Sequence, residues 1–201
     1  MKADCANCQS HACYTKGVNC TGLDREEILS AYSEEDRQIM KAAAYVEGTF
    51  YSNITRLQET AEFAKAMGYK KLGMAFCIGL NAEARLIARY YHQQGFEFYS
   101  VCCKTCSFSK KELELKQVKP DLPHEAMCNP KIQARLLAEK GTELFISCGL
   151  CVGHDALFNA ACPGPVTTLV VKDRLLAHNP LGAIYSRYWK KKLNLLSEGE
   201  V

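Results

Sequence analysis

Apolar residues recur at helical spacing in the first third of the chain, after a polar leader. The pattern that follows Asp24 predicts a first helix. Ser33 with Asp36 three residues later resembles a capping box and predicts the start of a second helix. A third helix is expected over 53–68, where the apolar residues fall on one side and a glycine ends the pattern.

From residue 71 onward, short apolar runs alternate with amphipathic stretches. Strands are expected at 71–77, 96–102, 143–148 and 166–171. Helices are expected at 81–91, at 130–141, from about 155, and at 181–196. Asn129 is the expected cap of the second of these helices, and Pro130 suits its first position.

This order of elements predicts the fold class, because successive parallel strands need crossover connections, usually helices. Such connections are right-handed and cover both faces of the sheet. We therefore expect an α/β protein, a small Rossmann-like three-layer sandwich with about four parallel strands. The expected division is a cysteine-rich metal-binding leader at 1–22, a helical segment packed on the main domain at 23–68, and the Rossmann-like domain at 69–201.

The composition is that of a globular protein with one anomaly, its cysteine content. Of 201 residues, 48% are hydrophobic and 23% charged, with 25 Lys and Arg against 22 Asp and Glu, which argues against a disordered or electrostatically dedicated nucleic-acid-binding protein. No signal peptide and no transmembrane run is recognisable, so we expect a cytoplasmic protein. The 12 cysteines are then expected to bind metal or to do redox chemistry rather than to form disulfides.

Four cysteines lie in a leader that has few large apolar residues and cannot fold by burial alone. They are Cys5, Cys8, Cys13 and Cys20. Four thiolates suit a tetrahedral zinc ion or an iron–sulfur cluster, and the spacing does not decide between them. His11 could replace one cysteine as a zinc ligand, although an exposed loop histidine is the favoured interpretation.

Six further cysteines collect near the carboxyl ends of the predicted strands, the edge where parallel sheets bind ligands. They are Cys77, Cys102, Cys103, Cys128, Cys148 and Cys151. Cys102 and Cys103 are adjacent, which is too close in sequence for an ordinary unstrained disulfide. At most one of them need be a ligand, and the other can pack inside. The alternative is that all six are buried structural thiols.

A local repeat marks two of these strand ends, since 77–82 and 151–156 share the order Cys, β-branched residue, Gly, any residue, Asn or Asp, Ala. Both segments precede a predicted helix, whose amino terminus favours thiolate over thiol. His154 and Asp155 add titratable groups and are candidate catalytic residues. Alternatively, His154 bonds to backbone at the helix entry, with Asp155 as the cap. His178, after the fourth strand, could also approach this edge.

Two nucleotide-binding motifs are missing. Neither the dinucleotide fingerprint Gly-x-Gly-x-x-Gly nor a phosphate-binding P-loop occurs, so the fold class does not imply a nucleotide cofactor. The short basic runs at 110–111 and 190–192 read as solvated helix surface rather than a nucleic-acid-binding face. We expect neither nucleic acid nor membrane as a partner.

Several segments resemble a family of uncharacterised prokaryotic cysteine-rich metal-binding proteins found largely in anaerobes. These segments are 76–80, 101–104, 128–130, 149–155, 164–167, 172–174 and 178–180. The leader cysteines match the cysteine-rich start of that family. The resemblance implies metal binding without an assigned reaction. It also favours Cys77, Cys103, Cys128 and Cys151 over Cys106 and Cys148, which lie outside the family's pattern.

The leading hypothesis is an iron–sulfur protein with one cluster on the leader and a second centre at the strand ends. It would serve electron transfer or redox chemistry on a small substrate, as an oxidoreductase or with a redox partner protein. The alternative is a non-enzymatic protein that binds or senses zinc or another soft metal. A third hypothesis makes Cys77 or Cys151 a catalytic nucleophile with His154 as its base.

Overall fold

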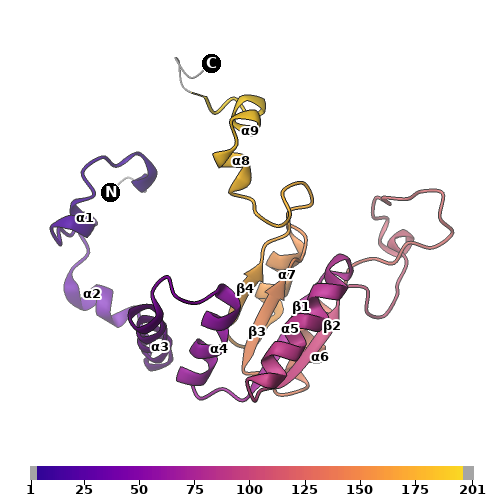
Figure 1. The fold of residues 1–201 in the computed structure, drawn as a ribbon, viewed down its shortest axis with the longest axis horizontal. Coiled ribbons are helices and arrows are strands. Elements are labelled where there is room, and N and C mark those ends of the chain that lie inside the picture. Colours follow the sequence, from indigo (N-terminus) through magenta and orange to yellow (C-terminus); the bar gives the residue numbers. More distant parts are fainter. Residues whose placement is uncertain (1–3, 197–201) are drawn as a thin grey trace. The chain divides into compact units, whose positions relative to one another are not determined.

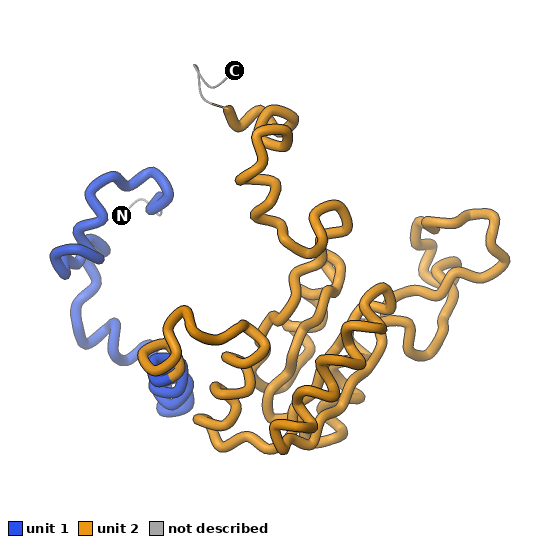
Figure 2. The backbone as a smooth tube through the Cα atoms, viewed as in Figure 1, with its two compact units in different colours: residues 1–45 blue, residues 46–201 orange. Residues whose placement is uncertain are grey.

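A computed structural model of the chain describes residues 4–196. The chain divides into two compact units, residues 1–45 and 46–201 (Figure 2). The division into three segments expected from the sequence stays a prediction, and the outermost residues of its first and last segments lie outside the described part of the chain.

The first unit consists of short helices without a core of their own. Its helical elements are the 3-10 helix Cys5–Asn7, α1 Ala12–Thr15, α2 Arg25–Ser30 and the first part of α3 Glu34–Phe50. Asp24 caps α2 by accepting a hydrogen bond from the Glu27 amide at 2.7 Å. Ser33 and Asp36 form the expected reciprocal cap of α3. No residue from 4 to 41 is buried, so burial does not hold this segment together.

The second unit contains a parallel sheet of β1 Lys71–Phe76, β2 Glu97–Cys102, β3 Leu144–Cys148 and β4 Val166–Val170, in the order β2-β1-β3-β4 (Figure 1). Its helices are α4 Arg56–Ala66, α5 Asn81–Gln93, α6 Pro130–Ala138, α7 His154–Ala161, α8 Gly182–Tyr185 and α9 Arg187–Lys192. The 3-10 helices are Ile78–Leu80 and Lys110–Leu113. The expected α/β fold with a parallel sheet is therefore confirmed.

Two layers of helices cover the sheet, because strand side chains alternate between its faces. Leu72, Met74 and Phe76 of β1 pack with α4 and α5 on one face. Ala75 packs with α6 and α7 on the other face. Gly73 leaves room there for the Thr142 side chain, which would lie 2.6 Å from an added Cβ. The result is the expected three-layer sandwich.

One expected helix start is corrected: α4 begins after Thr55 rather than at about Asn53, because Thr55 and Gln58 form a capping box. α6 begins at Pro130 with Asn129 as its N-cap residue, as expected, but the Asn129 side chain makes no capping hydrogen bond. The Asn129 side-chain amide donates instead to the Thr105 carbonyl at 2.7 Å. This hydrogen bond holds together the two ends of the long connection between β2 and α6, residues 103–129.

The carboxyl-terminal helix expected at 181–196 is wrong as one continuous element. Ser186 is extended, with φ −77° and ψ 123°, and it separates α8 from α9. Neither helix has a buried residue. Short helices are marginal without tertiary packing, so nothing here enforces a longer one.

Helix length and composition also bear on membrane insertion. The longest helix, α3, has 17 residues and carries several charges. Within residues 4–196, no helix combines the length and the apolar character needed to cross a bilayer.

Candidate functional site

The strand-end cysteines divide between the two faces of the sheet. Phe76 pairs with Cys102 and with Cys148, and Phe76 and Cys148 belong to the core beneath α4 and α5. Cys77 and Cys103 each follow one residue later, and both pack on the α6 and α7 side. The alternation of strand side chains thus separates Cys148 from Cys77 and Cys103, although all three lie at strand ends.

Three of these cysteines, Cys77, Cys103 and Cys128, form what we call the thiol cluster. Cys103 lies in the middle: it packs with Cys77 in one buried cluster, Cys128 packs against that cluster, and the Cys103 thiol shifts the pKa values of both. Its own sulfur accepts a hydrogen bond from the Ile78 amide at 3.4 Å, and its carbonyl accepts one from the Asn129 amide at 2.9 Å. Residues from three separate segments therefore meet at one point.

Each outer thiol of the cluster has a lysine beside it. Lys104 Nζ donates to Cys128 Sγ at 3.4 Å and to the Ala126 carbonyl at 2.6 Å. Lys172 is hydrogen-bonded to Cys77. A Cβ added to Gly79 would lie 3.6 Å from Lys172 Nζ and 3.9 Å from Cys77 Sγ, so both groups lie over this glycine.

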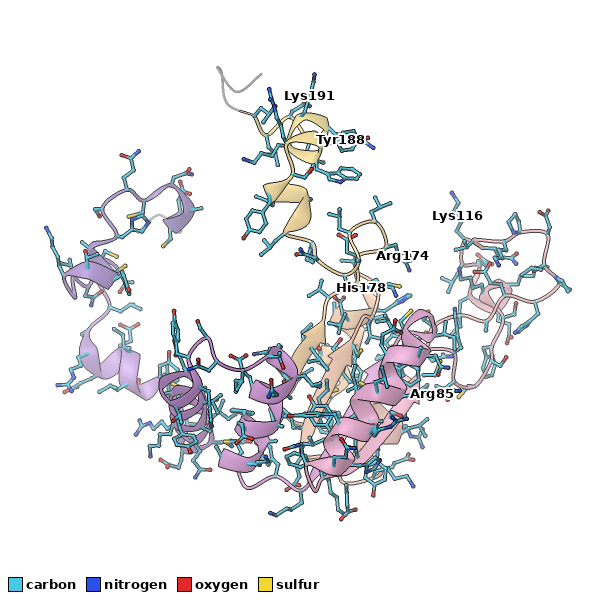
Figure 3. The ribbon with its side chains drawn as sticks, viewed as in Figure 1. Arg85, Lys116, Arg174, His178, Tyr188 and Lys191 are labelled. Atoms are coloured by element: carbon cyan, nitrogen blue, oxygen red, sulfur yellow. The ribbon has the colours of Figure 1, made fainter. Side chains whose placement is uncertain are left out.

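A third cation, Arg174, holds Cys151. Arg174 Nη2 donates to Cys151 Sγ at 2.9 Å. Arg174 lies on the loop after β4 that also carries His178 (Figure 3). Asp173 Oδ1 accepts from the amides of the two residues after Arg174, and His178 Nδ1 accepts from the Asp173 amide at 3.2 Å. Asp173 and His178 therefore brace the loop that presents Lys172 and Arg174.

These contacts decide where the protons of the cluster reside. The Cys103 thiol, the Gly79 amide and Lys172 hold the pKa of Cys77 well below its ordinary value, against the opposing effect of burial. The Cys103 thiol, the Lys104 charge and the nearby His154 likewise lower the pKa of Cys128. The hydrogen bonds to Cys128 and Cys77 raise the pKa of Cys103, which keeps its proton. These opposite shifts favour the thiolate form at Cys77 and Cys128 and the protonated form at Cys103.

The other core cysteines have different surroundings. Burial raises the pKa of Cys148 to about 12 and that of Cys162 to about 12, so both stay protonated. Cys102 lies at the margin of both faces, and its sulfur accepts a hydrogen bond from the Lys104 amide at 3.4 Å. Cys106 is exposed in the loop after β2. Cys148 contacts the thiol cluster only through its backbone, since its carbonyl accepts a hydrogen bond from the Cys77 amide at 3.1 Å among the contacts given for residues 4–196. Cys102 and Cys162 pack against the buried core that contains Cys77 and Cys103.

Two buried polar atoms beside the cluster have no hydrogen-bond partner within the described residues, Gln133 Oε1 and His154 Nδ1. Gln133 is fully buried, and its Nε2 donates to the Phe76 carbonyl at 3.3 Å and the Val101 carbonyl at 2.7 Å. The Phe76 carbonyl also accepts from the Cys103 amide, so Gln133 lies next to the cluster. Unpartnered buried polar atoms of this kind are costly, which is consistent with a site that takes a ligand.

The expected role of Asp155 as a helix cap is wrong. α7 begins at His154 with Gly153 as its N-cap residue, and Gly153 has φ +85°. The Asp155 carboxylate accepts instead from the Ala156 amide at 2.8 Å within the first turn. His154 lies close enough to the thiol cluster to lower the pKa of Cys128.

The leader cysteines are all exposed and unpaired. Cys5, Cys8, Cys13 and Cys20 have no disulfide, and hydrogen bonds from the His11 amide and from Ser10 lower the pKa of Cys8. Across residues 4–196, no three or more His, Cys, Asp or Glu side chains have the arrangement of a formed metal site. This holds for the leader and for the thiol cluster.

Lys104, Lys172, Arg174 and Gln133 are the residues that sequence reasoning missed at this site. Lys104 lies two residues after the end of β2, and Lys172 and Arg174 lie two and four residues after the end of β4. Placement at a strand end, the signal that singled out the cysteines, also marks these three cations. Gln133 gives no such signal, because a glutamine on an amphipathic helix ordinarily faces solvent.

The lowered pKa of Cys128 predicts an unusual pH dependence of alkylation. Iodoacetamide attacks thiolates, so its reaction with free cysteine, of pKa about 8.5, slows about a hundredfold between about pH 8 and about pH 6. A depressed pKa leaves Cys128 as thiolate over this range, so its alkylation in metal-free protein should slow less than about tenfold. Mass spectrometry of the Cys128 peptide gives the rates, and a hundredfold decrease would contradict the assignment.

Two comparisons with known proteins found a match, one to a family model and one to a relative. The family model described as "Protein of unknown function (DUF1847)" matches residues 16–169, which include every strand-end cysteine. An uncharacterised protein of Methanocaldococcus jannaschii is 47% identical over 190 residues, which are 94% of this chain and 97% of that protein. No solved structure matches the chain. Because the match covers most of the chain, this protein belongs to the DUF1847 family of proteins of unknown function.

Proposed function

We propose that the chain binds an iron–sulfur cluster at the strand ends, with Cys77, Cys103, Cys128 and Cys151 as its ligands. The observation that carries the proposal is the thiol cluster itself, in which three segments bring together three sulfurs, two of them as thiolates. Arg174, which holds Cys151, also lies within electrostatic range of Cys77 and Cys128. Cysteine thiolates are the usual ligands of such clusters.

The charges around the thiols fit an anionic group. Lys104, Lys172 and Arg174 supply three positive charges against the thiolates. A cluster held by four thiolates carries net negative charge, which these cations would offset in a partly buried site. The unpartnered Gln133 Oε1 and His154 Nδ1 are further polar groups beside the thiols. Loading requires Cys103 to lose its proton, because thiolate is the ligand form.

We propose that the leader cysteines Cys5, Cys8, Cys13 and Cys20 hold a second centre. The support is that residues 4–41 contain no buried residue, so a bound metal would provide the cross-link that burial does not. When bound, iron–sulfur clusters supply one-electron transfer. The protein would then act in electron transfer with a redox partner protein, or in redox chemistry on a small substrate.

Elemental analysis of anaerobically purified protein tests the proposal. We expect iron and acid-labile sulfide with a broad visible absorption that bleaches in air. Cys8→Ser and Cys151→Ser should each lower the iron content, whereas the control Cys162→Ser, whose thiol burial keeps protonated, should not. Absence of both iron and sulfide would overturn the proposal. Stoichiometric zinc in a colourless protein would favour the alternative, a non-enzymatic zinc-binding or soft-metal-binding protein.

A second candidate function is supported by the thiolate state of Cys77, which lysine and amide contacts stabilise without a metal. Cys77 would then be a catalytic nucleophile, with His154 as a base near the cluster. Fast and selective alkylation of Cys77 that is unchanged by added iron or zinc would favour this function. Protection of Cys77 by the metal would favour metal binding.

A further inference from the structure

The middle position of Cys103 suits it to a reaction beyond metal binding. It packs with Cys77, Cys128 packs against the same buried cluster, and the Asn129 amide donates to the Cys103 carbonyl at 2.9 Å. Cys103 is only 2% exposed. Cys128 is half-buried and therefore more accessible to a reagent than Cys103. An accessible thiol in contact with a buried one is the arrangement of an attacking thiol and a resolving thiol.

We propose that Cys103 and Cys128 form a reversible disulfide in the metal-free protein, with a low-molecular-weight disulfide as the oxidant. Cys128 loses its proton and, as thiolate, attacks one sulfur of the oxidant RSSR, forming Cys128–S–S–R and releasing RS⁻. Cys103 then loses its proton and attacks the Cys128 sulfur, which forms the Cys103–Cys128 bond and releases a second RS⁻. Overall, two protein thiols are oxidised to one disulfide and RSSR is reduced to two RSH.

Sheet geometry favours Cys128 over Cys77 as the partner of Cys103. Cys77 and Cys103 follow the paired residues Phe76 and Cys102, and the Cys103 amide donates to the Phe76 carbonyl at 2.8 Å. The Cys77 amide in turn donates to the Cys148 carbonyl at 3.1 Å. These backbone bonds hold Cys77 at the end of the sheet and leave it little freedom to move toward Cys103.

Cys128 has more freedom to move than Cys77. It precedes α6 in a segment outside the strands, and it is connected to Cys103 through the excursion of residues 104–127. Two hydrogen bonds keep this segment beside Cys103: Lys104 Nζ donates to Cys128 Sγ, and the Asn129 backbone amide donates to the Cys103 carbonyl. The segment around Cys128 can therefore move the short distance toward Cys103 that the disulfide needs, without breaking the hydrogen bonds between the parallel strands.

The disulfide would control metal loading, and this consequence rests on the proposed function. It would occupy two of the four proposed ligands, so oxidised protein could not take up the strand-end metal until the bond is reduced. Disulfide formation itself needs no metal and is testable separately.

The experiment treats metal-free, fully reduced protein with glutathione disulfide under anaerobic conditions and maps disulfides by mass spectrometry without reduction. A Cys102→Ser background makes the assignment unique, since Cys102 and Cys103 otherwise share one tryptic peptide. We expect a linked Cys103–Cys128 peptide. Adding Cys103→Ser should stop the reaction at a glutathione adduct on Cys128, and adding Cys128→Ser should abolish the link. The control Cys162→Ser should leave it unchanged.

Specific outcomes overturn the inference. One is a stable glutathione adduct on Cys128 with Cys103 still free, and another is a Cys77–Cys103 link in its place. Metal uptake by the reduced and oxidised forms separates the two proposals. A Cys103–Cys128 link in a protein that binds no metal when reduced overturns only the proposed function. Metal binding without the link overturns only this inference.

Discussion

Replacing Cys103 with Ser is expected to abolish iron binding at the strand ends, whereas replacing its neighbour Cys102 with Ser is expected to leave that iron in place. Cys103 contacts both other thiols of the cluster. Cys102 lies one residue earlier and has no sulfur contact of this kind within residues 4–196; its sulfur accepts from the Lys104 amide. Both substitutions replace one sulfur atom with oxygen, at adjacent positions. A difference in iron content between the two variants therefore shows that the position of the thiol decides iron binding.

The measurement uses a background in which the four leader cysteines are Ser, so that iron can bind only at the strand ends. Iron, sulfide and visible absorption are compared after anaerobic reconstitution. Cys148→Ser is a second control, since this thiol lies at a strand end but packs beneath α4 and α5. Circular dichroism verifies that each variant is folded. Equal iron in the Cys103→Ser and Cys102→Ser variants would exclude Cys103 as a ligand.

Gly149→Ala is expected to destabilise the protein by about 2–4 kcal/mol, from a left-handed backbone and a steric clash together. Gly149 has φ +62°, and an added Cβ would collide with the Leu80 side chain. Leu80 is buried and is the last residue of the 3-10 helix Ile78–Leu80, which connects Cys77 to α5. Displacing it should also disturb Cys77, so metal affinity at the strand ends should fall with stability.

Gly68→Ala is the matched control for this substitution. Gly68 has φ +76°, but an added Cβ would meet nothing within 4 Å. Only the conformational cost applies, about 1–2 kcal/mol, so Gly68→Ala should be the milder change. Urea unfolding gives both free energies. Equal destabilisation by the two substitutions would show that the contact with Leu80 contributes nothing.

Local sequence signals account for much of the secondary structure. The reciprocal cap of Ser33 and Asp36 and the placement of Pro130 in the first turn of α6 were predictable, because each depends on a few neighbouring residues. The single helix expected at 181–196 was wrong, because helical spacing does not reveal whether an apolar face will be packed.

The sequence predicted at which edge of the sheet the candidate site lies, but not which side chains contact one another there. Strand-end placement collected Cys77, Cys103 and Cys148 together. The register then assigns Cys148 to one face of the sheet and the other two to the opposite face. The cations of the site were not predicted, since Lys172 and Arg174 reach the thiols only through the braced loop after β4.

The sequence by itself therefore determined the order of strands and helices along the chain, the parallel sheet and the strand ends that carry cysteine. Hydrophobic periodicity acts locally, and right-handed crossovers join consecutive elements, so both can be predicted from the sequence. Only the tertiary structure decided that Cys77, Cys103 and Cys128 meet and that each outer thiol has a cation beside it. Those contacts depend on strand order, register and loop packing, which join residues far apart in the chain.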